Sequence, residues 1–139
     1  QAEIQKCEVL CANCHRRKHG RIPASVERLQ SMIHPSDHID DLLTESQMAD
    51  YTSFQRAWVH LYKAANGCSH CCEGEGICLD LPHRNAEKKR RSISQLISRG
   101  CSANELHTEI RKCDVLCANC HRKEHYEIPD DVTAADEGV

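Results

Sequence analysis

Residues 113–125 read Cys-Asp-Val-Leu-Cys-Ala-Asn-Cys-His-Arg-Lys-Glu-His, and the organisation of the chain follows from this stretch. Cys117 and Cys120 form a Cys-x-x-Cys knuckle, whose two thiolates can hold half of a tetrahedral zinc site. His121 follows the knuckle directly, and His125 comes four residues later, on the same face of a helix. The stretch therefore predicts a zinc-binding turn with two imidazoles on the helix behind it.

The same stretch occurs twice in the chain. Residues 3–23 read EIQKCEVLCANCHRRKHGRIP, and residues 109–129 read EIRKCDVLCANCHRKEHYEIP. Each residue of the first copy has its counterpart 106 positions later, and most of these pairs are identical. An internal duplication of this kind predicts two units of related structure. Cys11 and Cys14 are accordingly candidate ligands of a second zinc ion.

The composition indicates a small domain that depends on a metal. The chain has 139 residues, of which 4% are aromatic, and a mean hydropathy of −0.62, so a large apolar core is not expected. Its eleven Cys and ten His also fit a secreted disulfide scaffold. The cysteines are, however, paired as Cys-x-x-Cys beside His, their number is odd, and no signal peptide is evident. We therefore expect reduced thiols that bind zinc, in a cytoplasmic protein without a membrane span.

The formal net charge of −3 conceals an uneven distribution. Lys and Arg gather at 16–21 and 84–91, whereas acidic residues gather at 37–50 and 130–137. A charge run is often only a solvated face, but both basic runs lie close in sequence to His residues. Phosphate contact needs Lys and Arg near the reacting groups, so this closeness favours a role in binding. We expect contacts with nucleic acid from a set of basic side chains: Arg84, Lys88, Lys89, Arg90 and Arg122.

Local patterns predict short elements. In the first copy we expect a helix ending near residue 6, a strand over 8–10 and a helix over 12–19 that Gly20 ends as a C′ residue. Later elements are a helix over 44–66 with an apolar stripe, a strand over 77–81, helices over 93–98 and 103–112 with capping boxes, and a strand over 114–116. The expected organisation is a partial copy (1–23), a linker (24–43), a domain with its leading helix (44–129) and an acidic, disordered tail (130–139).

The second half of the chain resembles the HNH endonuclease family, in particular its small phage and prokaryotic members. The likeness rests on ICLDLPHRN at 77–85 and on 92–125 with its CANCHR core. It implies an α+β fold, in which a zinc-stapled, treble-clef-like ββα-metal unit has flanking helices.

The resemblance also implies a catalytic site. His83 would be the general base that deprotonates the attacking water, since imidazole titrates near neutral pH. Asn119 would orient His83. His121, with His125 and Asp80, would hold Mg²⁺, Mn²⁺ or another divalent ion that polarises the scissile phosphate. A separate structural zinc would be held by four thiolates, those of Cys68, Cys71, Cys117 and Cys120.

Two departures from the family pattern bear on these expectations. The residue before the base is usually a metal-binding His or Asp, but here it is Pro82, so Asp80 would have to substitute for it. The first copy lacks an upstream Cys-x-x-Cys. Either its missing half precedes Gln1, which we favour, or the copy borrows a thiolate from within the chain or from a second subunit in a homodimer. The internal candidates are Cys72 and Cys78, and Asp37-His38 is a remote alternative for the missing strand histidine.

Three functions compete on this basis. The first is a metal-dependent HNH endonuclease that hydrolyses DNA phosphodiester bonds, which the His83, His121 and His125 set favours. The second is a zinc-stabilised nucleic-acid-binding module that has lost catalysis, which Pro82 and the partial copy favour. The third is a redox or metal-storage protein. The His and Arg that directly follow each knuckle argue against this third function.

Overall fold

The computed structural model describes residues 3–32, 51–88 and 91–125. Within these ranges it contains helices and one two-stranded sheet, the mixture expected of an α+β chain. The helices are α1 (Ala12–His19), α2 (Val26–Met32), α3 (Tyr51–Asn66), α4 (Ile93–Ser98), α5 (Ala103–Ile110) and α6 (Ala118–His125). The strands are β1 (Leu79–Asp80) and β2 (Leu116–Cys117), and three short 3-10 turns are η1 (Ile4–Lys6), η3 (Gly76–Cys78) and η4 (Ala86–Lys88).

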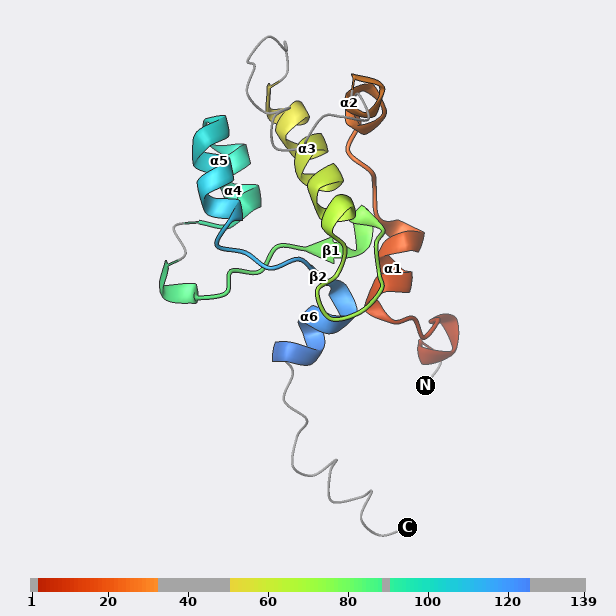
Figure 1. Ribbon diagram of the computed structural model, residues 1–139. Helices are drawn as coiled ribbons and strands as arrows, with labels where there is room; N and C mark the ends of the chain where they lie inside the picture. The colour runs from red at the N-terminus through yellow and green to blue at the C-terminus, as the bar shows by residue number, and fades with distance from the viewer. Residues whose placement is uncertain (1–2, 33–50, 89–90, 126–139) are drawn as a thin grey trace.

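Helix α3 is the central packing element (Figure 1). It lies between α2 on one side and α4 with α5 on the other, and its C-terminal end reaches the sheet. Phe54, Ala57 and Trp58 are buried at the three- and four-residue spacing that the sequence predicts. The helix ends at Asn66 because Gly67 has a φ of 70°, a left-handed conformation that favours glycine at C′. The predicted beginning of this helix at residue 44 lies outside the described residues.

The next two helices begin where the sequence predicts, because a capping box fixes the start of each. Ser92 and Gln95 form a capping box at the start of α4, and Ser102 and Glu105 form one at the start of α5. Both helices then bury apolar side chains against α3: Ile93, Leu96, Ile97, Leu106 and Ile110.

The sheet is shorter than predicted. β1 and β2 are antiparallel, with Leu79 opposite Cys117 and Asp80 opposite Leu116. Residues 76–78 form η3 in place of a strand, because the Cys78 N–H donates to the Glu75 carbonyl in a turn. Beyond the strands, an isolated bridge joins His83 to Cys113. The pairing therefore brings the predicted base to the end of α5.

Three expectations for the first part of the chain are corrected. Within the predicted linker, α2 forms because Val26 and Leu29 are buried against α3. Residues 8–10 are not a strand, since they pair with no other strand among the described residues. Gly20 follows α1 but has a φ of −71°. Glycine is needed there for space, because a Cβ at this position would lie 2.5 Å from the backbone oxygen of Arg16.

The duplicated sequence allows a matched test of the core. Ile110 is 2% exposed, whereas its counterpart Ile4 is 76% exposed. Ile110→Ala should lower the free energy of unfolding by about 2–5 kcal/mol, because it leaves a cavity in the core. Ile4→Ala should change it by about 0.5 kcal/mol or less. Urea unfolding of the zinc-loaded protein measures both, and equal losses would contradict the packing described here.

Candidate functional site

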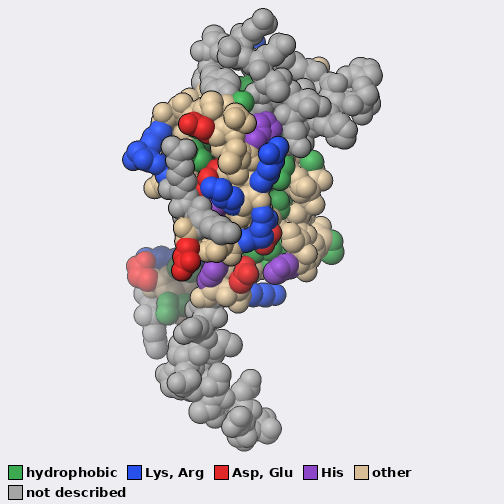
Figure 2. Space-filling view, turned by 60° about the vertical axis from the view of Figure 1, so that its left-hand side comes forward, with side chains coloured by type: hydrophobic (Ala, Val, Ile, Leu, Met, Phe, Trp, Pro, Cys, Tyr) green, Lys and Arg blue, Asp and Glu red, His purple; other side chains and the backbone are tan. Residues whose placement is uncertain are grey.

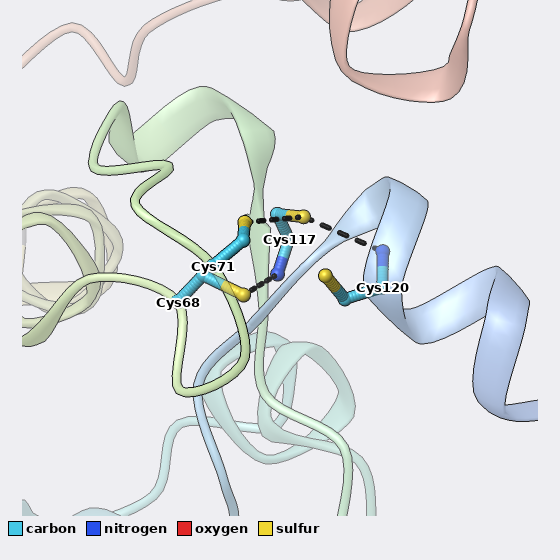
Figure 3. A group of neighbouring side chains, drawn as sticks. All are labelled: Cys68, Cys71, Cys117 and Cys120. Carbon is cyan, nitrogen blue, oxygen red and sulfur yellow. Dashed lines mark hydrogen bonds between the residues drawn. The ribbon is translucent and has the colours of Figure 1, made fainter.

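A cluster of four thiols joins two distant parts of the chain (Figure 3). Cys68 and Cys71 come from the loop after α3, and Cys117 and Cys120 come from β2 and the first turn of α6. Their sulfur atoms all lie within 4.8 Å of one another. Tetrahedral zinc with Zn–S bonds of about 2.3 Å sets its sulfurs about 3.8 Å apart, so the arrangement fits zinc after a small contraction. The predicted set of structural ligands is thus brought together.

Backbone donors support negative charge on these sulfurs. The Cys117 N–H donates to the Cys68 sulfur at 3.2 Å, and the Cys120 N–H donates to the Cys117 sulfur at 3.4 Å. Burial alone would raise the pKa of Cys68, but the backbone N–H groups of Cys117, His70 and Cys71 lower it to about 6. The hydrogen bond with Cys117 raises the pKa of Cys120 to about 12. All four sulfurs would therefore be ionised together only with a cation between them, and a divalent ion would supply the required charge.

A second feature is a cavity of ≈ 470 Å³. It collects the side chains predicted for catalysis from three places in the chain: Asp80 on β1, His83 after it, and His121 and His125 on α6. The rings of His121 and His125 have centroids 5.1 Å apart, as the four-residue helical spacing predicts. The cavity is also lined by Lys63 of α3, which the sequence analysis did not identify.

His83 is held by a carboxylate. Its Nε2 atom lies 2.8 Å from Oε1 of Glu109, and the two side chains are 5% and 3% exposed. Lys112 donates to the other carboxylate oxygen at 2.8 Å. With Glu109 ionised, Nε2 carries the proton and Nδ1 of His83 is the free acceptor. Sequence reasoning missed Glu109. The available signal was a charged residue on the apolar face of a helix, next to Leu106 and Ile110.

Asn119, predicted to orient His83, makes a different contact. Its Oδ1 atom accepts from the Asn13 backbone N–H at 3.2 Å, and its own N–H donates to Asn13 Oδ1 at 3.2 Å. This reciprocal pair joins equivalent positions of the two copies across α1 and α6. Asn119 therefore joins the two copies, and the side chain that contacts His83 is that of Glu109.

The carboxylate of Asp80 is hydrogen-bonded by an arginine of the first copy. Arg16 of α1 donates to both of its carboxylate oxygens, at 2.7 and 3.1 Å, and His121 Nδ1 lies 3.1 Å from one of them. Burial alone would raise the pKa of Asp80, but the hydrogen bonds from Arg16 and His121 hold it below its usual value. Among the described residues, the four cysteines are the one group of three or more metal-binding side chains that converge. Asp80 and His121 thus provide two adjacent donors, with Arg16 already on the carboxylate.

Lys63 contributes a further cation to the cavity wall. Its Nζ donates to the Leu79 carbonyl at 2.8 Å, and burial lowers the pKa of the ammonium. The nearby carboxylate of Asp80 partly opposes that effect. The ammonium of Lys63 therefore lines the cavity, where an anionic group would be favoured.

The structure describes some of the basic residues predicted to contact nucleic acid. Arg84 is exposed but already paired within the chain, because its guanidinium donates to the Cys113 carbonyl at 2.9 Å and to Asp114 at 3.2 Å. Arg122 is exposed on α6. Lys89 and Arg90 lie outside the described residues, as does the Lys88 side chain. On the face shown in Figure 2, basic and His side chains are interspersed with acidic ones, so this face has no field of a single sign.

The knuckle of the first copy is separate from the zinc cluster. Cys11 and Cys14 are exposed, and they belong to no converging group of metal-binding side chains among the described residues. Neither Cys72, which is exposed, nor Cys78, which is buried, completes a set with them.

No family model, curated protein or solved structure matches this chain. Within the described residues, no helix combines the length and the apolar character that a bilayer span requires.

The thiol cluster predicts a strong dependence on zinc. Cys68→Ser removes one of the four ligands and should lower the thermal midpoint by about 10 °C, because weaker zinc binding removes a few kcal/mol of stability. Cys72→Ser, at an exposed thiol outside the cluster, is the matched control and should retain its zinc and its midpoint. Zinc content by elemental analysis and thermal unfolding measure the two effects. Equal zinc content in both variants would contradict the assignment.

Proposed function

We propose that the protein is a metal-dependent endonuclease of the HNH type that hydrolyses phosphodiester bonds in DNA. The observation that carries the proposal is the convergence of Asp80, His83, His121 and His125 on one cavity. Its wall also holds the ammonium of Lys63, which suits an anionic phosphate. The resemblance in CANCHR and in the strand before His83 supports the same reaction class.

In this proposal His83 acts as the general base. Water gives a proton to the free Nδ1 atom and attacks phosphorus, while the bond from phosphorus to the leaving oxygen breaks. The buried carboxylate of Glu109 fixes the tautomer of His83 and stabilises the imidazolium that forms, as a carboxylate does behind a catalytic histidine. Glu109 is therefore a positioning residue rather than a catalytic one.

Asp80 and His121 would hold the divalent ion. Such an ion polarises the scissile phosphate and stabilises the leaving oxygen. Two protein ligands suffice for Mg²⁺ or Mn²⁺, which commonly keep several waters and take oxygen atoms of the substrate phosphate. Direct binding by Asp80 requires Arg16 to move off the carboxylate. His121 donates from Nδ1 to Asp80, which leaves its Nε2 atom as the donor to a metal, the usual arrangement for a metal-bound histidine.

A second candidate function is a zinc-stabilised module that binds nucleic acid without cutting it. The two-point contact of Arg16 with Asp80 favours this alternative, because an arginine already neutralises the carboxylate that an ion would use. Pro82, which has no ligating group, favours it as well.

Plasmid nicking separates the two functions. Metal-stripped protein, reloaded with structural zinc and then given Mg²⁺, Mn²⁺ or Ni²⁺, should nick supercoiled DNA. His83→Ala should lower the rate by about 10²–10⁴-fold, the usual contribution of a general base. His121→Ala should also abolish nicking, whereas His15→Ala, its counterpart in the first copy and no part of the cavity lining, should not. DNA binding in a gel without nicking under any metal would establish the binding module instead.

Arg16 provides a sharper test of Asp80. If Asp80 binds the ion directly, Arg16→Ala should raise nicking at low metal concentration by about 5-fold or more, because a competing cation is removed. Lys123→Ala, at an exposed cation of the second copy outside the predicted nucleic-acid contacts, is the control. Thermal midpoints of both variants show whether the fold is intact. An unchanged metal dependence in Arg16→Ala would show that Asp80 orients His121 and does not bind the ion.

A further inference from the structure

The two copies have the same local geometry. In each, a Lys lies 2.8 Å from the Glu three residues before it, Lys6 with Glu3 and Lys112 with Glu109. In each knuckle, the backbone N–H of the second Cys donates to the sulfur of the first at 3.4 Å. The His pairs of the two helices have ring centroids 4.9 and 5.1 Å apart. The knuckle and the helix of the first copy therefore match those of the second, although the first copy has no counterpart of β2.

The surroundings of the two copies differ completely. Val115 is buried and Leu116 is 1% exposed, whereas their identical counterparts Val9 and Leu10 are fully and 37% exposed. The first knuckle is exposed, while Cys117 is fully buried. These residues form an apolar edge with two thiols at its end. We call this edge the open knuckle: Glu3, Ile4, Val9, Leu10, Cys11 and Cys14.

The second copy shows what such an edge accepts. Its counterpart is covered by residues 68–83, which provide one loop and one strand. Ser69 N–H donates to the Val115 carbonyl at 2.8 Å, and Leu79 pairs with Cys117 in the sheet. Leu79, Val115 and Cys117 form a buried cluster. The same segment brings the Cys-x-x-Cys pair that completes the four-thiol set.

We propose that the open knuckle binds a separate polypeptide segment that carries a Cys-x-x-Cys pair followed by a short apolar strand, and that the two together hold a second zinc ion. The segment would supply two thiolates to join Cys11 and Cys14, and a strand to cover Val9 and Leu10. All six residues of the open knuckle are identical to those that accept residues 68–83 in the second copy. This site lies outside the cavity proposed for catalysis, so it stands or falls independently of the nuclease.

A second copy of the same knuckle is the competing occupant. Two chains could share a zinc through Cys11 and Cys14 of each. Such a pair would supply four thiolates, but it would bring neither the strand nor the loop N–H that meets the Val115 carbonyl from Ser69 in the second copy. The structure of the second copy favours a loop and strand, and the experiment below separates the two occupants.

The test uses the full chain and one synthetic peptide. The peptide has the sequence of residues 67–83 with Cys72→Ser and Cys78→Ser, so that its pair alone supplies thiolates. The chain should bind about one zinc ion alone and about two with the peptide present, by mass spectrometry of the intact complex. Omitting the added zinc should weaken peptide binding by about 100-fold, since the metal links the two parts.

Two variants locate the site. Cys11→Ser with Cys14→Ser should abolish both the second zinc and peptide binding while the first zinc stays. Val9→Asp should keep the thiolates but weaken peptide binding about 10-fold, because a charge disrupts the apolar edge. Cys72→Ser in the chain is the neutral control. The proposal is overturned by a zinc-linked dimer that excludes the peptide, by uptake of a peptide lacking both pair cysteines, or by the absence of a second zinc.

Discussion

The convergence of four thiols is the constraint on which the rest of the structure depends. Apart from α3, the helices are short, and helices of six to eight residues are marginal unless tertiary contacts hold them. The sheet adds two residue pairs. A zinc ion at this cluster closes a loop between positions 46 residues apart, Cys71 and Cys117. β1, His83, α4 and α5 all lie within that loop, so a metal bound at the cluster would both stabilise the fold and fix the walls of the cavity.

Local chemistry made part of this structure predictable from the sequence. α1 begins and ends as expected, since a knuckle precedes it and its sulfur accepts the N–H that caps the first turn. α4 and α5 begin at their predicted capping boxes. Each of these signals lies within four residues of the element that it defines. The four-thiol set was also predictable, because zinc-binding cysteines carry their spacing in the sequence.

What could not be predicted depends on contacts between distant residues. α2 has no strong pattern of its own and forms because Leu29 is buried against α3. Glu109 was recognisable as a charge on an apolar face, but its partner His83 lies 26 positions away. Arg16 and Asp80 are 64 positions apart, and no local pattern links them. The candidate residues were therefore largely found, whereas their partners, which decide what each can do, required the structure.

The first copy is attached to the second through one side of α1. Asn13 and Arg16 are three residues apart and so share a helical face, from which they reach Asn119 and Asp80. The Asn13 pair is largely buried, and its reciprocal hydrogen bonds set the position of α1. The Arg16 pair is about one third exposed, where an ion pair adds little stability by itself. The asparagine pair thus contributes more than the ion pair to the position of α1, and through Arg16 the partial copy contacts Asp80, a residue of the cavity lining.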